Sequence, residues 1–370
     1  MDGLQEGIKN MLRHCAGLET GSSVLIVSEG TDPAHYDPDL TRAVAATAQA
    51  IGLKVSLCEL AFSPEAVPPP PEVMAAIAAS DAAVFLSRRG DQLRFDPVMA
   101  ETRPVICYAL DREMMASGFG RADHRGLLAL MAVVNGALAA ARHIRVTCPL
   151  GTDFAGTGAR FPTTAGEVTV RRFPLSVFSP VPAADYAGTI ALAGFLSGTG
   201  KTYYQPYHLP LSDVLKVTFD GNRITGFAGP DAAAARAHFG AVAEMLGVDA
   251  SFVHSWHAGI HPGCAYEMQA AENIARWGCA AFGNPRVLHF HSCGTEPPGE
   301  ISLNVIDPTI RLDGVAVWQD GRLYPDRVAG GAEVLAAHPC LSQLFAHPVQ
   351  AIGLGPAGRL SAVPHTDPAR

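Results

Sequence analysis

The chain has 370 residues, and its 27 Lys and Arg stand against 35 Asp and Glu, which gives a formal net charge of −8. This acidic balance argues against a general nucleic-acid-binding protein, because such a protein carries an excess of positive charge. Hydrophobic residues make up 48% of the sequence, enough to bury large cores and to exclude intrinsic disorder. The length predicts two domains of about 100–200 residues each.

The eight cysteines are scattered through the chain without a C-x-x-C pair. In a chain of this size, that spacing is typical of reduced thiols in a cytoplasmic protein rather than of a disulfide framework. The first residues lack the basic segment and apolar core of a secretory signal. The longest apolar run, residues 126–141, is too short to span a bilayer. We therefore expect a soluble cytoplasmic protein without membrane or nucleic-acid partners.

Short apolar runs alternate with Ala-rich segments over residues 1–146. Strands are expected at 23–27, 54–60, 82–86 and 104–108, and helices at 40–51 and 72–79. Strands that alternate with helices indicate a parallel sheet covered by helices, so the first domain is predicted to be an open parallel α/β sheet. The apolar segment 126–141 is expected to be a buried helix that closes this domain.

The composition changes near Thr147, after which Gly, Pro, Thr and aromatic residues are frequent. Turn sequences at Asp220-Gly221 and Asp313-Gly314 are typical of β-hairpins. An Ala-rich helix is expected at 232–246. These features predict a second domain over residues 147–370, a mixed and mainly antiparallel α+β fold.

Histidines give the strongest chemical signal, since five of them fall close together: His254, His257, His261, His289 and His291. In a strand, His289 and His291 lie on one face, because side chains repeat with a period of two. Glu300 follows at the start of another strand-like run and would add a carboxylate. Two histidines and one carboxylate with open positions form the ligand set of non-haem Fe(II) oxygenases, and Zn, Mn and Co also accept such donors.

The alternative is that each of these histidines is a capping or core residue with one hydrogen-bond partner, a common use of this side chain. The clustering together with the strand alternation favours a metal site in the second domain. The spacing does not match a stereotyped metal motif such as H-E-x-x-H.

Paired arginines are the second signal. Arg88 and Arg89 follow an apolar run and so lie at a strand end, where ligands of open α/β sheets bind. Arg172 belongs to a second pair. Because the planar guanidinium group suits carboxylates, these three residues are predicted to bind an anionic substrate, and solvated surface arginines are the alternative.

An aromatic, hydroxyl-rich stretch follows Lys201 and contains Tyr204 and His208. These two residues are candidates for lining a substrate pocket, and packing against the neighbouring hairpin is an equal alternative. The preceding Gly198–Thr202 segment is similar to part of a phosphate-binding loop, but the required first glycine is Phe195.

The order of several motifs resembles the 2,5-dihydroxypyridine 5,6-dioxygenases, relatives of the aminopeptidase T/S metallopeptidases. Gly151-Thr152-Asp153-Phe154 is similar to the G-[ST]-D-F segment that begins the second domain of that family. Residues 222–226 resemble its hairpin, and residues 254–262 and 307–314 resemble its C-terminal metal region. The resemblance covers most of the chain and rests on the order of the motifs.

The resemblance implies one Fe(II) ion held by an upstream histidine and an H-x-D pair. The upstream ligand falls on or beside His254, with His257 as a competitor. The pair falls on Glu300-Ile301-Ser302, so the inherited ligand set is not intact, because serine is a poor ligand. His289 lies near a metal-binding histidine of the aminopeptidase branch. We infer a rebuilt site with these ligands: His254 or His257, His289, His291 and Glu300.

The sequence therefore predicts a divalent-metal enzyme that acts on a small N-heterocyclic, carboxylated substrate. Ring opening by Fe(II) and O₂ is the first choice, with His254, His257 and Glu300 as the catalytic groups. Hydrolysis by a water that Zn, Mn or Co activates is the alternative. A non-catalytic metal-binding or ligand-binding protein is the third. The resemblance also implies a homo-oligomer.

Overall fold

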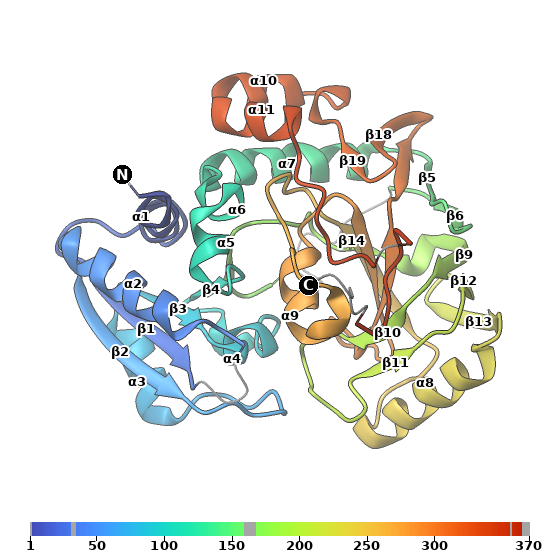
Figure 1. The fold of residues 1–370 in the computed structure, drawn as a ribbon, viewed down its shortest axis with the longest axis horizontal. Helices are drawn as coiled ribbons and strands as arrows, with labels where there is room; N and C mark the ends of the chain where they lie inside the picture. Colours follow the sequence, from blue (N-terminus) through green and yellow to red (C-terminus); the bar gives the residue numbers. More distant parts are fainter. Residues whose placement is uncertain (1, 31–34, 159–167, 356, 365–370) are drawn as a thin grey trace, which may run out of the picture.

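The computed structural model of the protein describes residues 2–30, 35–158, 168–355 and 357–364. Within these residues the strands form three sheets, of five, six and eight strands. The five-stranded sheet lies at one end of the molecule, at the left of Figure 1, and the larger sheets lie at the other end. No helix in the described part of the chain is long and apolar enough to cross a membrane.

The strands of the smaller sheet are β1 (Ser23–Glu29), β2 (Lys54–Leu60), β3 (Ala82–Leu86), β4 (Val105–Cys107) and β7 (Arg171–Phe173). Their order is β2-β1-β3-β4-β7, and every neighbouring pair is parallel. The sequence predicts the bounds of β2 and β3 to the residue and those of β1 and β4 closely. The predicted open parallel α/β sheet is confirmed.

Helices cover both faces of this sheet. They are α1 (Gly3–Lys9), the π-helix η1 (Asn10–Cys15), α2 (Pro38–Ala50), α3 (Pro71–Ala79), α4 (Arg88–Gln92), the 3₁₀ helix η2 (Pro97–Met99), α5 (Arg112–Ala116) and α6 (Gly118–Arg121). Val24 and Ile26 of β1 pack on the side of α1 and α2. Leu25 and Val27 pack on the side of α3, because side chains alternate along a strand.

The chain does not divide between the sheets at residue 146, where the sequence predicts a domain boundary. Strand β5 (Ile144–Thr147) spans that residue and belongs to the eight-stranded sheet, as does β6 (Asp153–Gly156). Strand β7 then returns to the five-stranded sheet and pairs with β4. The apolar helix α7 (His124–Ala140) packs into the core of the larger sheets instead of closing the first domain. Any segment can pair with an open sheet edge, so chain order does not determine which one does.

Both larger sheets are antiparallel. The six-stranded sheet contains, in spatial order, β11 (His208–Pro210), β10 (Phe195–Gly198), β16 (Ile301–Ile306), β15 (Val287–Ser292), β14 (Val253–Ala258) and β8 (Val181–Pro182). The eight-stranded sheet contains β13 (Arg223–Ala228), β12 (Leu215–Asp220), β9 (Tyr186–Leu192), β6, β5, β17 (Thr309–Leu312), β18 (Val315–Gln319) and β19 (Arg322–Leu323). The predicted mainly antiparallel second half is confirmed.

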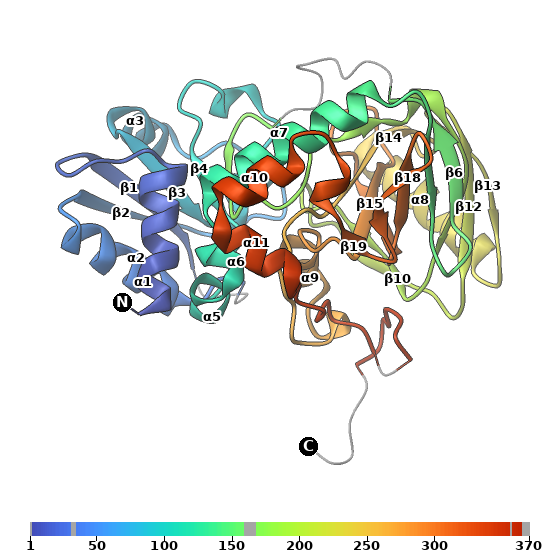
Figure 2. The same ribbon diagram turned by 90° about the horizontal axis from the view of Figure 1, so that it is seen from above.

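The remaining helices surround these sheets. They are η3 (Ala183–Asp185), α8 (Ala232–Leu246), η4 (Ala270–Glu272), α9 (Ile274–Ala281), η5 (Pro325–Arg327), α10 (Gly331–Ala337) and α11 (Pro339–Ala346). Helix α8 has the predicted bounds and ends at Gly247, whose positive φ of 68° suits the residue after a helix. Figure 2 shows α10 and α11 beside α7, which runs between the two ends of the molecule.

An apolar core between the two larger sheets determines which way the histidines of β15 point. Phe154 of β6 contacts Trp256 of β14 and Phe290 of β15 edge to face, with ring centroids 5.6 and 5.0 Å apart. Because Phe290 points into this core, its neighbours His289 and His291 lie on the opposite face of the six-stranded sheet. That face is turned toward the five-stranded sheet, and a cavity lies between them.

Candidate metal centre

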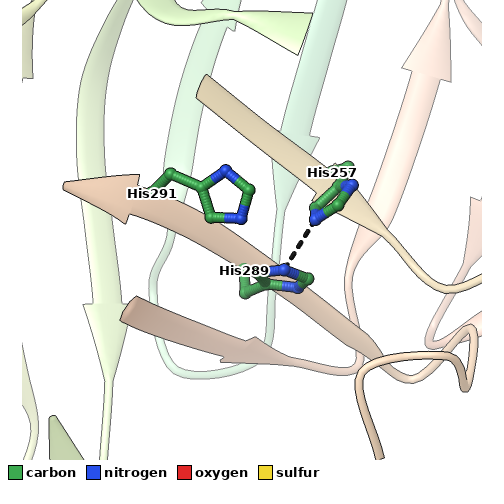
Figure 3. Close-up of side chains that lie close together, drawn as sticks. All are labelled: His257, His289 and His291. Atoms are coloured by element: carbon green, nitrogen blue, oxygen red, sulfur yellow. Dashed lines mark hydrogen bonds between the residues drawn. The ribbon is translucent and has the colours of Figure 1, made fainter. Parts of the chain in front are cut away.

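Three buried imidazoles converge from two adjacent strands. His257 of β14 pairs with His289 of β15 in the antiparallel register, and His291 lies two residues further along β15. One ligand atom from each ring lies within 4.8 Å of the others. Figure 3 shows the three rings on the same side of the sheet. The prediction that His289 and His291 share a strand face is confirmed, and we call His257, His289 and His291 the histidine triad.

Hydrogen bonds orient the first of these rings. The Nδ1 atom of His257 lies 3.0 Å from the carbonyl oxygen of Phe178, which only accepts, so the proton sits on Nδ1. The unprotonated Nε2 of His257 is then directed at Nε2 of His289, at 2.6 Å. The Nδ1 atom of His289 is buried and has no partner among the described residues. Phe282 stacks on the His289 ring, with centroids 4.0 Å apart.

All three imidazoles are uncharged at neutral pH. Burial, with a smaller contribution from the positive charges of Arg172 and Arg94, lowers the pKa of His257 to about 3. Burial is also the main cause that holds the pKa of His289 and His291 well below the ordinary value, with the charge of His257 added. Neutral imidazole is the form that binds metals.

The residues fit a divalent metal ion. The Nε2 atoms of His257 and His289 lie 2.6 Å apart and can bind one cation when the proton of His289 sits on its Nδ1 atom, which has no partner among the described residues. Imidazole donors suit Zn, Cu, Fe and Ni, and three histidines with an open position are a known catalytic zinc arrangement. Within the described ranges no carboxylate belongs to this group.

Two predicted ligands lie outside the triad. Glu300 directly precedes β16, and its buried Oε1 atom is 3.8 Å from Nζ of Lys201. The imidazole of His254 is half-buried and its Nδ1 atom is 2.9 Å from Oγ of Ser255. His254 lies at the irregular pairing between Val253 and Ser255, three residues before His257, and Glu300 directly precedes Ile301, where the pairing of β16 with β15 begins.

The hydroxyl group of Ser255 connects His254 with the triad. Its Oγ atom is 3.2 Å from Nδ1 of His291 and 2.9 Å from Nδ1 of His254, and Ser255 is buried. A hydroxyl that accepts from His291 and donates to His254 fixes the proton of His291 on Nδ1. The Nε2 atom of His291 is then available to a metal.

Replacing Ser255 with alanine is therefore expected to weaken metal binding by about 10–100-fold, the usual effect of losing a group that orients a ligand. The dissociation constant for Zn²⁺ or Co²⁺ would be measured by competition with a chromophoric chelator. Ser292→Ala is the matched control, because the buried Ser292 hydroxyl donates to the Ile301 carbonyl oxygen instead. Equal metal affinity in the two variants would contradict the role of Ser255.

His261, the remaining member of the histidine cluster, lies apart from the triad. It follows β14, its ring meets Phe119 edge to face at 5.0 Å, and its Nδ1 accepts a hydrogen bond from the backbone N–H of Gly263. Burial lowers its pKa to about 3. The histidine is therefore neutral in the folded protein at pH values where an unfolded chain would protonate it.

The free energy of unfolding is expected to fall as the pH decreases from 6.5 toward 3. In this window the unfolded state binds a proton at His261 and the folded state does not, which costs about 1.4 kcal/mol per pH unit. Above pH 6.5 neither state is protonated and the contribution is constant. Urea unfolding of the chelator-treated protein at pH 6.5, 5.5 and 4.5 measures the slope. The variant His261→Gln should show a slope smaller by about that amount, and parallel curves would contradict the assignment.

A cavity of about 410 Å³ lies next to the triad. The triad and Ser302 line it from the six-stranded sheet, and Tyr108, Arg171 and Arg172 line it from the side of the five-stranded sheet. Asp91, Arg94, Phe95, Tyr207, Cys279 and Phe282 also contribute to its walls. This volume is in the range of small-molecule sites.

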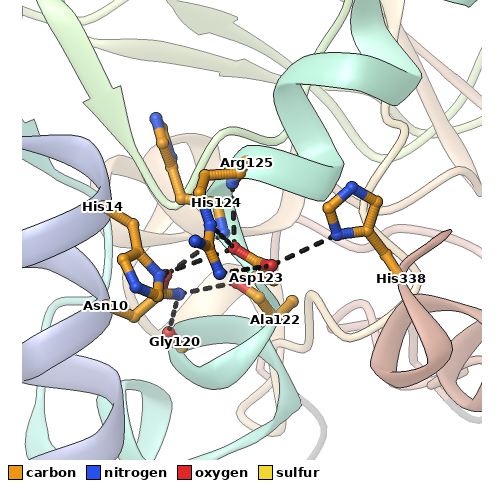
Figure 4. Close-up of polar contacts among 8 residues, drawn as sticks. All are labelled: Asn10, His14, Gly120, Ala122, Asp123, His124, Arg125 and His338. Atoms are coloured by element: carbon orange, nitrogen blue, oxygen red, sulfur yellow. Dashed lines mark hydrogen bonds and ion pairs between the residues drawn. The ribbon is translucent and has the colours of Figure 1, made fainter. Parts of the chain in front are cut away.

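A polar network at the cavity mouth joins three parts of the chain (Figure 4). Asp123 caps α7, and its carboxylate lies 3.5 Å from Nδ1 of His14 in η1 and 3.2 Å from Nδ1 of His338 between α10 and α11. Asn10 donates to the carbonyl oxygens of Gly120 and Ala122. These contacts fix the π-helix that carries the cavity-lining residue His14.

The predicted anion-binding residues Arg88 and Arg89 do not line the cavity. Arg88 is buried against Glu29, with Nε 2.8 Å from Oε1, and its guanidinium lies 3.6 Å from the Phe62 ring centroid. Arg89 donates to the carbonyl oxygen of Val67. Helix α4 begins at Arg88, so both side chains turn back to the strand ends instead of outward. Arg172 does line the cavity.

Tyr204 and His208 also lie outside the cavity lining. The Tyr204 hydroxyl donates to the carbonyl oxygen of Glu300, and His208 begins the edge strand β11. Tyr207, between them in sequence, reaches the cavity. Sequence reasoning missed Asp91 and Arg94 as site residues, and their only signal is their place one or two turns after a strand end.

No protein-family model and no curated protein matches the chain. Its fold, however, is similar to that of a solved structure. The structure of 2,5-dihydroxypyridine dioxygenase from Pseudomonas putida KT2440 matches with a TM-score of 0.60 and 17% sequence identity, over 87% of this chain and 96% of that chain. AmpT from Thermus thermophilus matches with a TM-score of 0.47 and 12% identity, over 87% and 98%. The first match confirms, for the fold, the resemblance inferred from the sequence.

Proposed function

We propose that the protein is a divalent-metal enzyme in which the histidine triad holds the metal at the inner wall of the cavity. The observation that carries this proposal is the convergence of three buried, neutral imidazoles, one of which has a nitrogen without a partner among the described residues. Strongly perturbed titratable groups in a concave site are typical of functional centres. The fold that this chain shares with a dioxygenase supports the same conclusion.

The first candidate reaction is the opening of a small N-heterocyclic ring by O₂. A ferrous ion at the triad would supply the redox chemistry, with open positions for substrate and O₂. The protein would hold the ring among aromatic side chains, since Phe95, Tyr108, Tyr207 and Phe282 line the cavity. Tyr108 donates a hydrogen bond to Asp91 at 2.7 Å, which fixes the face that its ring presents to a substrate.

The second candidate reaction is hydrolysis of an amide. It is favoured by the absence of a carboxylate from the donor group within the described residues, because three histidines and a water are the ligand set of a catalytic zinc ion. Such a metal lowers the pKa of its bound water to about 7. Glu300 lies outside the triad and is not among the residues that line the cavity, so it has no direct place in this chemistry.

Metal analysis of protein purified without O₂ separates the candidates. Bound iron together with O₂ uptake in the presence of hydroxylated pyridines supports ring opening. Bound Zn, Mn or Co with turnover of aryl amides in the absence of O₂ supports hydrolysis. A bound metal without either activity would make the chain a metal-binding or ligand-binding protein, and a protein that binds no metal would overturn the proposal.

We also propose a cytoplasmic homo-oligomer. All eight cysteines are free, which supports a reducing compartment. The oligomeric state follows only from the family resemblance, and light scattering of the purified protein would measure it.

A further inference from the structure

The cavity next to the triad is strongly cationic, although the chain as a whole has a net charge of −8. Among the described residues, its lining contains four arginines and one acidic residue, which are Arg94, Arg103, Arg171, Arg172 and Asp91. Positive charge gathered in a concave site with low-dielectric walls attracts anions and concentrates them there. The cavity therefore contrasts in charge with the rest of the protein.

Arg94 is held rigidly on the inner wall. Its Nη1 atom donates to the backbone oxygen of Asp91 at 2.6 Å and to the carboxylate at 3.1 Å, and its Nη2 atom donates to the carbonyl oxygen of Thr199 at 2.9 Å. Asp91 also accepts a hydrogen bond from Tyr108. A guanidinium fixed by three bonds loses little entropy when it binds a ligand, and the Asp91 carboxylate is its ion-pair partner.

Arg172 supplies the second inner charge. It lies on β7 opposite Ile106 of β4, so the parallel sheet carries it to the cavity. Arg94 and Arg172 line the same cavity as His257 and His289. The two guanidinium groups are thus within electrostatic reach of the triad, across the cavity from the metal ligands.

We propose that Arg172, together with Arg94, forms a carboxylate-binding subsite that holds an acidic substituent of an aromatic substrate while the ring faces the triad. The planar fork of arginine matches a carboxylate through paired hydrogen bonds, which a lysine cannot reproduce. The aromatic side chains of Tyr108, Tyr207 and Phe282 in the same lining suit a flat ring. Only the statement that the ring faces a metal rests on the proposed function.

Arg171 extends the positive charge toward the mouth. Its Nη1 atom donates to the backbone oxygens of Ala16 and Cys15, and its Nε and Nη2 atoms have no partner within the described residues. The half-buried side chain lines the cavity together with the exposed Arg103. These outer arginines attract an anion to the opening, and the inner pair binds it.

Calorimetry on the chelator-treated protein tests the subsite without any metal. The probes are two isosteric pairs, pyridine-3-carboxylate with pyridine-3-carboxamide and benzoate with benzamide. The wild-type protein is expected to bind each acid at least about tenfold more tightly than its amide. Arg172→Gln should lose about 30-fold or more in acid affinity and leave amide binding unchanged. Arg172→Lys should recover only part of the loss, because the charge returns without the fork.

Arg145→Gln is the matched control, since Arg145 is an exposed arginine paired with Asp153 far from the cavity lining. Circular dichroism would show that each variant is folded. Equal binding of acid and amide by the wild type, or unchanged acid binding by Arg172→Gln, would overturn the proposal. Displacement of the acids by inorganic phosphate at lower concentration would assign the subsite to phosphate instead and would overturn it as well.

The two proposals fail separately. Acid preference that persists in the variant His289→Ala supports the subsite whether or not a metal binds. Normal metal content in Arg172→Gln with lost acid preference supports both. Metal binding without any acid preference in the wild type overturns the subsite alone.

Discussion

Replacing His289 with alanine is expected to reduce bound metal at least about tenfold, the scale of losses seen when groups that hold a metal are removed. His289 is central to the triad, because its Nε2 atom lies 2.6 Å from that of His257 and its ring lies between the other two imidazoles and Phe282. Inductively coupled plasma mass spectrometry after dialysis against one equivalent of metal measures the effect.

Glu300→Gln is the matched comparison for His289→Ala. The sequence places Glu300 among the ligands, whereas the structure places it next to Lys201 and outside the triad. The glutamine variant is therefore expected to retain its metal. Stoichiometric metal in His289→Ala would contradict the triad, and metal loss in Glu300→Gln would restore the carboxylate to the site.

The second large effect is expected from Glu29→Ala. Glu29 and Arg88 form a buried ion pair in which Oε1 accepts from Nε at 2.8 Å and Oε2 accepts from the Arg88 backbone N–H at 3.0 Å. Removing the carboxylate leaves a buried guanidinium without its counter-charge, and such a change costs about 3–5 kcal/mol of stability. Urea denaturation at pH 7 measures the loss.

The exposed pair Arg145–Asp153 provides the comparison, because both side chains are 52% accessible. Asp153→Ala should shift the unfolding midpoint very little, since solvent screens exposed pairs. The double variant Glu29→Ala with Arg88→Met should regain part of the lost stability, because it also removes the buried positive charge that Glu29 balanced. Equal losses of unfolding free energy in Glu29→Ala and Asp153→Ala would contradict the larger contribution expected from the buried ion pair.

Local patterns were sufficient to predict several elements of the fold. The apolar runs that became β2 and β3 and the Ala-rich segment that became α8 have the predicted bounds, because each is short and uniform in character. What the patterns did not contain is the pairing between distant segments. Strand β7 has three residues, and no feature of Arg171–Phe173 indicates that its partner is β4.

In the candidate site, too, some features follow from local patterns and others depend on tertiary structure. Period-two alternation within one strand was enough to place His289 and His291 together. The choice of His257 over His254 depends on the register between β14 and β15, which places His257 opposite His289, and this register is a tertiary property. The directions of the Arg88 and Arg172 side chains depend on which groups surround each residue in the fold. The buried carboxylate of Glu29 accepts a hydrogen bond from Arg88 and so sets its direction.

Strand β7 is synthesised after β5 and β6, and this order has a consequence for folding on the ribosome. Strands β1 to β4 emerge first, but the sheet acquires its last strand only after β5 and β6, which belong elsewhere, have also been made. In the interval, the backbone N–H and C=O groups on the edge of β4 that later faces β7 have no strand partner and can pair with another nascent chain. The amino-terminal part is therefore expected to need chaperone protection until residue 173 has left the exit tunnel, and to complete its fold together with the part that follows it.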